Sequence, residues 1–191
     1  QLPSGVGVIG IDNFSEQTTR LVRGALSGFD ASDLPLTGVV LDLRGNTGGS
    51  LLQACKVADL FVEEGTILRT EGRGGKSVEN LLRHYRAHPE GVEPDVPMVI
   101  LMDHRSASAS EIVAGALSLL GRAALVGEPS HGKGTVQKLY TLRGGEADKR
   151  VRFKVTVARY RLPGDVAIET GVGLVPDLGV ADARFTRGGV S

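Results

Sequence analysis

The sequence from 105 to 117 reads Arg-Ser-Ala-Ser-Ala-Ser-Glu-Ile-Val-Ala-Gly-Ala-Leu, with serine and alanine alternating in its first half. It follows an apolar run at 99–102 with the composition of a buried strand, and it continues into apolar residues at helical spacing. Ser108 and Glu111 have capping-box spacing, which predicts a strand-to-helix turn with Ser108 or a neighbour at the helix start. The free amides of such a helix start suit a developing oxyanion, although the same serines would also serve as an ordinary cap.

A lysine between two glycines is the second feature that points to chemistry. Lys133 stands between Gly132 and Gly134, after another apolar run at 123–126. Glycine permits positive φ and close approach of neighbouring groups, so this lysine can be directed inward. A lysine in a poorly solvated pocket loses affinity for its proton and can take the proton of a serine. Lys133 is therefore a candidate general base.

A glycine-containing loop at 44–49 joins an expected strand at 38–43 to an expected helix at 50–61. Paired glycines let backbone amides point into a site, although a simple tight turn would use them equally well. If the loop lies against the serine turn, we expect an oxyanion hole with one amide from Gly48 or Gly49 and another from Ala109. The loop lacks the Gly-Lys-Ser/Thr ending of a phosphate-binding loop.

Together these motifs resemble those of the carboxyl-terminal processing proteases, also called tail-specific proteases. Four motifs stand in the family's order between 38 and 177. They are Leu-Asp-Leu-Arg-Gly-Asn-Thr-Gly-Gly at 41–49, Ser-Ala-Ser-Ala-Ser-Glu-Ile at 106–112, Gly-Lys-Gly-Thr-Val-Gln at 132–137 with Gly-Arg-Ala and Val-Gly-Glu before it, and Gly-Val-Gly-Leu-Val-Pro-Asp at 171–177.

The resemblance implies specific roles. The family's nucleophile falls on Ser108 and its general-base lysine on Lys133, while the glutamine that orients the lysine ammonium falls on Gln137. Two positions depart from the family pattern. Leu119 stands where some members carry an aspartate, so no acidic third member is expected, and His131 stands where an aromatic residue is usual.

The resemblance also implies a fold and an activity. The strand and helix patterns predict an α/β domain, and the family adds a crotonase-like ββα spiral, here expected as a single catalytic core over 1–191. Most members carry a PDZ module ahead of the core, for which this chain has no room, so we expect the catalytic core alone. The implied function is a serine endopeptidase that cleaves proteins near their carboxyl terminus through an acyl-enzyme.

The same resemblance suggests partners and a location. The implied substrates are proteins with apolar carboxyl-terminal tails, including membrane-delivered ones, and the implied location is extracytoplasmic. Neither substrate identity nor oligomeric state is encoded in any motif.

Three alternatives stay open. Retinoid-carrying proteins of the same fold family bind a ligand and cleave nothing. A core without its PDZ module could be inactive, with Lys133 beyond hydrogen-bond reach of Ser108. His104 lies close enough in sequence to the serines for a Ser-His arrangement to be conceivable.

Composition limits the remaining classes. The 191 residues are 41% hydrophobic and 23% charged, typical of a globular domain. Lys plus Arg equals Asp plus Glu, 22 each, so nucleic-acid or anionic-membrane binding has no electrostatic support. The single cysteine, Cys55, lies in a helical pattern and is expected in the core. No apolar run approaches the ~20 residues of a membrane span, and the first residues do not form a signal peptide.

No cofactor or metal is expected. His84 and His88 stand four apart in an expected helix at 79–88, but no zinc motif surrounds them, which favours a solvated helix face. The remaining pattern predicts a half-exposed strand at 151–160 and an ordered loop at 162–177 packed back near the site, with a frayed end at 188–191.

Overall fold

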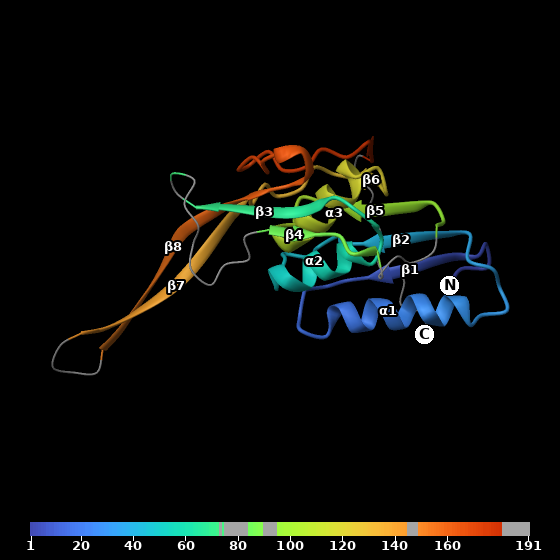
Figure 1. Cartoon of the computed structure of the whole chain (residues 1–191), viewed down its shortest axis with the longest axis horizontal. Coiled ribbons are helices and arrows are strands. Elements are labelled where there is room, and N and C mark those ends of the chain that lie inside the picture. The colour runs from blue at the N-terminus through green and yellow to red at the C-terminus, as the bar shows by residue number, and fades with distance from the viewer. Residues whose placement is uncertain (73, 75–83, 90–94, 145–148, 181–191) are drawn as a thin grey trace.

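The computed structural model describes the whole chain except residues 73, 75–83, 90–94, 145–148 and 181–191 (Figure 1). Strands and helices alternate over the first two thirds of the sequence, except that three described strands follow one another between residues 66 and 102. In chain order they are β1 Val6–Gly10, α1 Thr18–Asp30, β2 Gly38–Asp42, α2 Leu51–Asp59, β3 Thr66–Gly72, β4 His84–Arg86, β5 Met98–Met102, α3 Ala109–Leu119, β6 Ala124–Gly127, β7 Thr135–Gly144, β8 Lys149–Arg161, the 3-10 helix η3 Pro163–Asp165, and β9 Leu178–Gly179.

A five-stranded parallel sheet with the order β1-β2-β5-β6-β9 positions the site. Its central strands are short apolar runs, of which β2 is Gly-Val-Val-Leu-Asp and β5 is Met-Val-Ile-Leu-Met. Such runs are typical of strands covered on both faces. Because neighbouring strands run in the same direction, the loops that follow β2, β5 and β6 all leave from one edge of the sheet.

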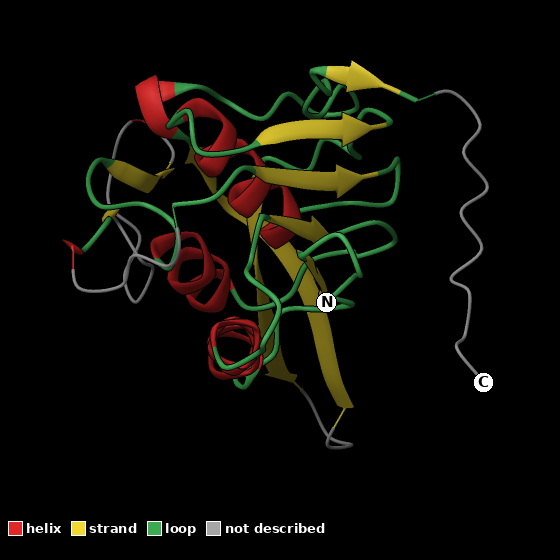
Figure 2. Cartoon of the chain, turned by 90° about the vertical axis from the view of Figure 1, so that its right-hand side faces the viewer, coloured by secondary structure: helices red, strands yellow, loops and turns green. Residues whose placement is uncertain are grey.

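The second sheet is antiparallel and has the order β4-β3-β8-β7. Helix α3 contacts β6 of the parallel sheet and β3 of the antiparallel sheet, and α2 packs between α1 and α3. Figure 2 shows the helices beside the stacked strands of the parallel sheet. The predicted α/β core domain is confirmed.

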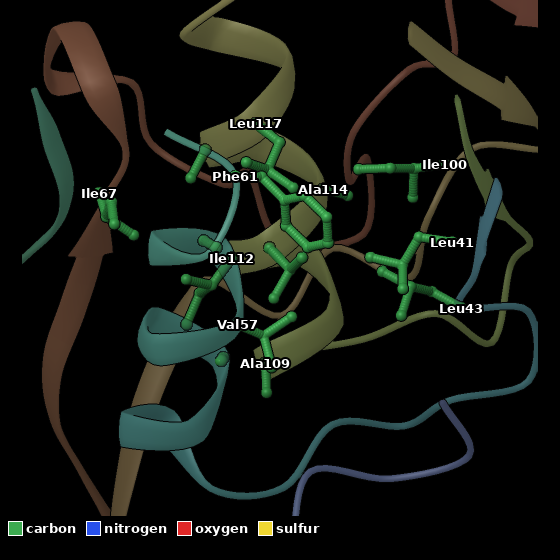
Figure 3. Close-up of a cluster of buried hydrophobic side chains, with 14 of the residues drawn as sticks. Leu41, Leu43, Val57, Phe61, Ile67, Ile100, Ala109, Ile112, Ala114 and Leu117 are labelled. Carbon is green, nitrogen blue, oxygen red and sulfur yellow. The ribbon is translucent and has the colours of Figure 1, made fainter. Parts of the chain in front are cut away.

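The main core lies where α2 and α3 meet the central strands (Figure 3). Helix α3 is buried on nearly all sides because its sequence is apolar or small almost throughout. Phe61 is the largest of the fully buried side chains, and Cys55 is fully buried as predicted. The other labelled members of the cluster are Leu41, Leu43, Val57, Ile67, Ile100, Ala109, Ile112, Ala114 and Leu117.

The helix predicted at 79–88 is wrong where the structure describes it. Residues 84–86 form strand β4, which pairs with β3, while 79–83 lie outside the described residues. His84 bonds to the hydroxyl of Thr66, and His88 bonds to the Asp59 carboxylate. Pairing with β3 overrides the local helical spacing, so the two histidines do not share a helix face.

The strand predicted at 151–160 is present, but it is not half-exposed along its whole length. Residues 151–156 are exposed on both faces, and burial begins only toward Ala158 and Tyr160. The reason is visible in Figure 1, where β7 and β8 form a long hairpin that extends away from the helices. The alternation of apolar and polar residues thus predicted the strand correctly, although no core packs against most of its length.

Candidate active site

The carboxyl ends of three adjacent parallel strands bring the predicted motifs together. The glycine loop follows β2, the serine turn follows β5, and the lysine loop follows β6. Hydrogen bonds join these segments directly: the Ala107 amide donates to the Asn46 carbonyl at 3.0 Å, and the His131 amide donates to the Ser106 carbonyl at 2.9 Å. Three motifs that are distant in sequence therefore form one continuous surface.

Ser108 stands at the N-cap of α3 in an unusual backbone conformation, with φ 57° and ψ −110°. A positive φ at a residue other than glycine costs of order 1–3 kcal/mol and persists only where the surroundings enforce it. Ser108 is half-buried, whereas Ala107 and Ala109 on either side are buried. The turn thus leaves the serine as the accessible residue, as a nucleophile requires.

The buried carboxylate of Glu111 holds this conformation. Its Oε2 accepts a hydrogen bond from the Ser108 amide at 2.7 Å, which is the backbone half of the predicted capping box. Glu111 also lies in the first turn of α3, where the helix dipole favours a negative charge.

Lys133 lies on the loop between β6 and β7, close to the serine turn. The Lys133 amide donates to Glu111 Oε2 at 2.8 Å, and Lys133 as a whole is half-buried. The flanking glycines are required, since a Cβ on Gly132 would lie 2.6 Å from the Glu169 carbonyl oxygen and one on Gly134 would lie 2.1 Å from that of Ile168. Within the described residues, no hydrogen bond joins the Lys133 amine to Ser108.

The glycine loop contacts the serine turn, as an oxyanion hole would need. A Cβ on Gly48 would lie 3.1 Å from the Ala109 amide nitrogen. The Gly48 amide, however, donates to the side-chain oxygen of buried Asn46 at 2.8 Å. The Gly48 amide therefore already has an acceptor, which leaves the Gly49 amide as the other predicted donor beside that of Ala109, whose amide at the first helical position has no intrahelical acceptor.

Tyr160 is a neighbour of Ser108 that motif reasoning missed. Its phenol is almost fully buried, and this burial raises its pKa, with the nearby Ser108 hydroxyl opposing the rise. The Tyr160 amide also donates to the Gly134 carbonyl at 2.9 Å, next to Lys133. Only strand pairing places this residue at the site, so no short motif could have identified it.

Three other residues singled out in the sequence have side chains with no described contact to Ser108. His104 is exposed and bonds to Glu128 at 2.8 Å, which does not support a Ser-His arrangement. The His131 side chain is exposed. Gln137 is exposed on β7, opposite Thr156, and no described hydrogen bond joins it to Lys133, so its orienting role stays a prediction.

The loop at 162–177 packs back against the lysine loop, as predicted. The Ser130 amide donates to the Leu174 carbonyl at 3.0 Å, and the Leu174 amide donates to the Ser130 hydroxyl at 2.7 Å. Asp177, the end of the fourth motif, accepts a hydrogen bond from the Leu125 amide of β6 at 2.7 Å. This motif therefore supports the strand that delivers Lys133.

Comparison with known proteins assigns the family. The model of peptidase family S41 matches residues 5–180, so the chain belongs to this family of peptidases. It is 36% identical over 176 residues to a carboxy-terminal-processing protease of Bartonella bacilliformis, covering 91% of this chain and 38% of that protein. It is 37% identical over 172 residues to the carboxyl-terminal-processing protease of Synechocystis sp., covering 90% and 37%.

A solved structure gives the same result. The photosystem II D1 C-terminal processing protease superimposes with a TM-score of 0.78 and 30% identity, over 92% of this chain and 42% of that one. The resemblance identified from the four motifs is thereby confirmed. This chain spans roughly two fifths of the length of these relatives.

Proposed function

We propose that this chain is a serine endopeptidase core that uses Ser108 and Lys133 as a dyad and cleaves proteins near their carboxyl terminus. The observation that carries the proposal is the shared contact of the Ser108 and Lys133 amides with one buried carboxylate, beside the glycine loop. The names of its relatives, which are carboxyl-terminal-processing proteases, support the carboxyl-terminal specificity.

The mechanism is acyl transfer. The Ser108 oxygen attacks the carbonyl carbon of the scissile peptide while its proton passes to the uncharged amine of Lys133. The amides of Gly49 and Ala109 donate to the oxyanion, and the protonated Lys133 gives its proton to the departing amine. Water then attacks the acyl-enzyme while Lys133 accepts its proton. The bond to the Ser108 oxygen breaks, the new carboxyl terminus leaves, and Lys133 returns the proton to Ser108.

The dyad contact itself forms on substrate binding in this proposal. Catalytic hydrogen bonds are commonly long before substrate arrives and tighten in the reactive complex. Lys133 lies on a glycine-flanked loop, and its main-chain amide already shares one acceptor with that of Ser108, so the movement proposed here is a change in the Lys133 side chain alone. Gln137 would hold the ammonium in that complex.

The substrates are proteins with unstructured apolar carboxyl-terminal tails, and the location is extracytoplasmic or lumenal. Two relatives with 32% identity are named as chloroplastic, which supports the location. In the described residues, no helix is long and apolar enough to cross a membrane.

Mass spectrometry of the peptides released from an unstructured protein tests the proposal. Ser108→Ala and Lys133→Ala should each lower turnover by on the order of 10⁴- to 10⁶-fold, while circular dichroism shows the fold retained. Ser118→Ala on α3 and Lys56→Ala on α2 are matched controls and should leave cleavage unchanged. Near-normal cleavage by Ser108→Ala or Lys133→Ala would refute the dyad.

Labelling with a serine-directed phosphonate distinguishes a protease core that is inactive without its PDZ module from a ligand-carrying protein. A core that lacks only substrate delivery should still be labelled at Ser108, and Lys133→Ala should slow that labelling. Retinoid binding with neither labelling nor cleavage would instead indicate a carrier.

A further inference from the structure

Glu111 is a buried acid that the proposed proton transfers do not use. Its exposed fraction is 0%, and its two carboxylate oxygens accept four hydrogen bonds. A buried carboxylate normally needs such compensation, since taking its charge out of water is costly. All four donors belong to the segments that carry the proposed catalytic residues, which is unexpected for a group serving only as a helix cap.

The two carboxylate oxygens of Glu111 accept from different donors. Oε2 bridges the two proposed catalytic residues, because it accepts from the Ser108 amide at 2.7 Å and from the Lys133 amide at 2.8 Å. Oε1 accepts from the Gly132 amide at 2.7 Å and from the Ser130 hydroxyl at 2.6 Å. One rigid planar group therefore fixes the separation between the nucleophile turn and the lysine loop.

A third segment is tied to the same carboxylate through Ser130. The Leu174 amide donates to the Ser130 hydroxyl, which in turn donates to Glu111. The loop at 162–177 is thus linked by a chain of hydrogen bonds to the start of α3. A displacement of this loop would therefore also shift Lys133 and Ser108, because Glu111 is hydrogen-bonded to both segments.

The conformation of Ser108 explains why a charged acceptor is needed. With φ at 57°, the Ser108 backbone is in a region that a non-glycine residue occupies only when held there. Hydrogen bonds to an ionised acceptor are roughly twice as strong as neutral ones, so the Glu111 contact is suited to hold it.

We propose that Glu111 is a positioning residue that sets the distance between the Ser108 hydroxyl and the Lys133 amine. The inference rests on the proposed function, and it assigns Glu111 no contact with substrate. It also makes a chemical requirement explicit: the position needs a side chain that only accepts hydrogen bonds, because four donors face it.

The test is the rate at which a serine-directed phosphonate labels Ser108 in four variants. Glu111→Gln places an amide NH₂ against at least one backbone amide in either orientation, and we expect labelling to slow by about 100-fold, as for misplaced reacting groups. Glu111→Asp keeps the acceptor chemistry and should recover part of this loss. Ser130→Ala removes one donor and should have a smaller effect. Glu128→Gln is the control, since the half-exposed Glu128 carboxylate bonds only to His104 in the described structure.

A double-mutant cycle distinguishes positioning from scaffolding. If Glu111 acts through Lys133, Glu111→Gln should slow labelling far less in the Lys133→Ala background than in the unaltered chain. An equal fold-loss in both backgrounds, or a folded Glu111→Gln with labelling within threefold of the unaltered rate, would overturn the proposal. If Glu111→Gln does not fold, Ser130→Ala replaces it in the double-mutant cycle with Lys133→Ala, and an equal fold-loss in both backgrounds again overturns the proposal.

Failure of the proposed function has a different signature. In that case Ser108 would not be labelled in the unaltered chain, or Lys133→Ala would be labelled at the same rate. Either result would refute the Ser108–Lys133 dyad, and both are measured without any Glu111 variant. Peptide cleavage gives a second readout, where Glu111→Gln should lower kcat with little change in KM.

Discussion

Gly48 and Ser108 lie so close that no side chain fits between them: a Cβ on Gly48 would lie 2.9 Å from the Ser108 Cβ. It would also lie 2.9 Å from the Ala107 carbonyl oxygen. The bare backbone of the glycine loop is therefore part of the wall around the nucleophile. Gly48 also has φ of +109°, a conformation that side chains disfavour.

Gly48→Ala should lower kcat/KM by at least about 100-fold, because the added Cβ would press on the Ala109 amide, a proposed oxyanion donor, and losing one such donor costs 10²- to 10³-fold. Steady-state cleavage of a peptide measures this effect. Gly45→Ala is the matched control, since Gly45 also has a positive φ of +73° but open space where a Cβ would lie. If both variants lose activity equally, backbone strain and not contact with Ser108 is the cause.

Tyr160→Phe removes the buried phenol hydroxyl, which we expect to form a hydrogen bond with the neighbouring Ser108 hydroxyl. Because a single hydrogen bond contributes about 1 kcal/mol, we expect phosphonate labelling to slow by roughly fivefold. Tyr140→Phe, on the exposed hairpin, should leave the rate unchanged. An unaltered rate in Tyr160→Phe would show that the contact does not orient the nucleophile.

Cys55 should make stability depend on alkaline pH. Burial raises the pKa of its thiol to about 12, with the nearby Asp59 carboxylate adding to the rise. The unfolded thiol ionises near pH 9 while the folded one keeps its proton, so its stabilising contribution is complete below pH 9 and is lost as pH rises toward 12.

Urea unfolding at several pH values checks this dependence. The free-energy difference between the unaltered chain and Cys55→Ala should shrink by about 1.4 kcal/mol per pH unit above pH 9. Below pH 8 the difference should be constant. A difference that stays flat up to pH 11 would contradict a buried thiol.

Phe61→Ala should lower the free energy of unfolding by about 3–5 kcal/mol, because it leaves a cavity in the core shown in Figure 3. Leu139→Ala should change it by less than about 0.5 kcal/mol, since Leu139 is 56% exposed on the β7–β8 hairpin. Urea unfolding measures both. A large loss from Leu139→Ala would mean that the hairpin is covered in solution.

The local elements could be predicted because each is encoded by neighbouring residues. The apolar runs of β2 and β5 identify buried strands, and the apolar periodicity after Ser108 identifies α3. Where a segment takes its structure from a distant partner, prediction failed: β4 is a strand because it pairs with β3. The exposure of residues 151–156 was missed for the same reason, since alternation does not report whether a core lies behind a strand.

The candidate site likewise contains residues that the sequence predicted and residues that it did not. Ser108, Lys133 and the glycine loop were found because they stand in short motifs. Tyr160 was not, because its role depends on where strand β8 carries it, and the contacts of Asn46 within the glycine-loop motif were likewise not predicted. Glu111 was recognised as a cap but not as the acceptor for the lysine loop.

By itself, the sequence determined the α/β class, the family and the order of the four motifs, since these depend on composition and spacing along the chain. The tertiary structure decided that three of those motifs meet, because parallel strand order places the carboxyl ends of β2, β5 and β6 side by side. It also decided that one buried carboxylate joins the serine turn to the lysine loop. Such contacts depend on which strands become neighbours, and this is settled only when the whole core packs.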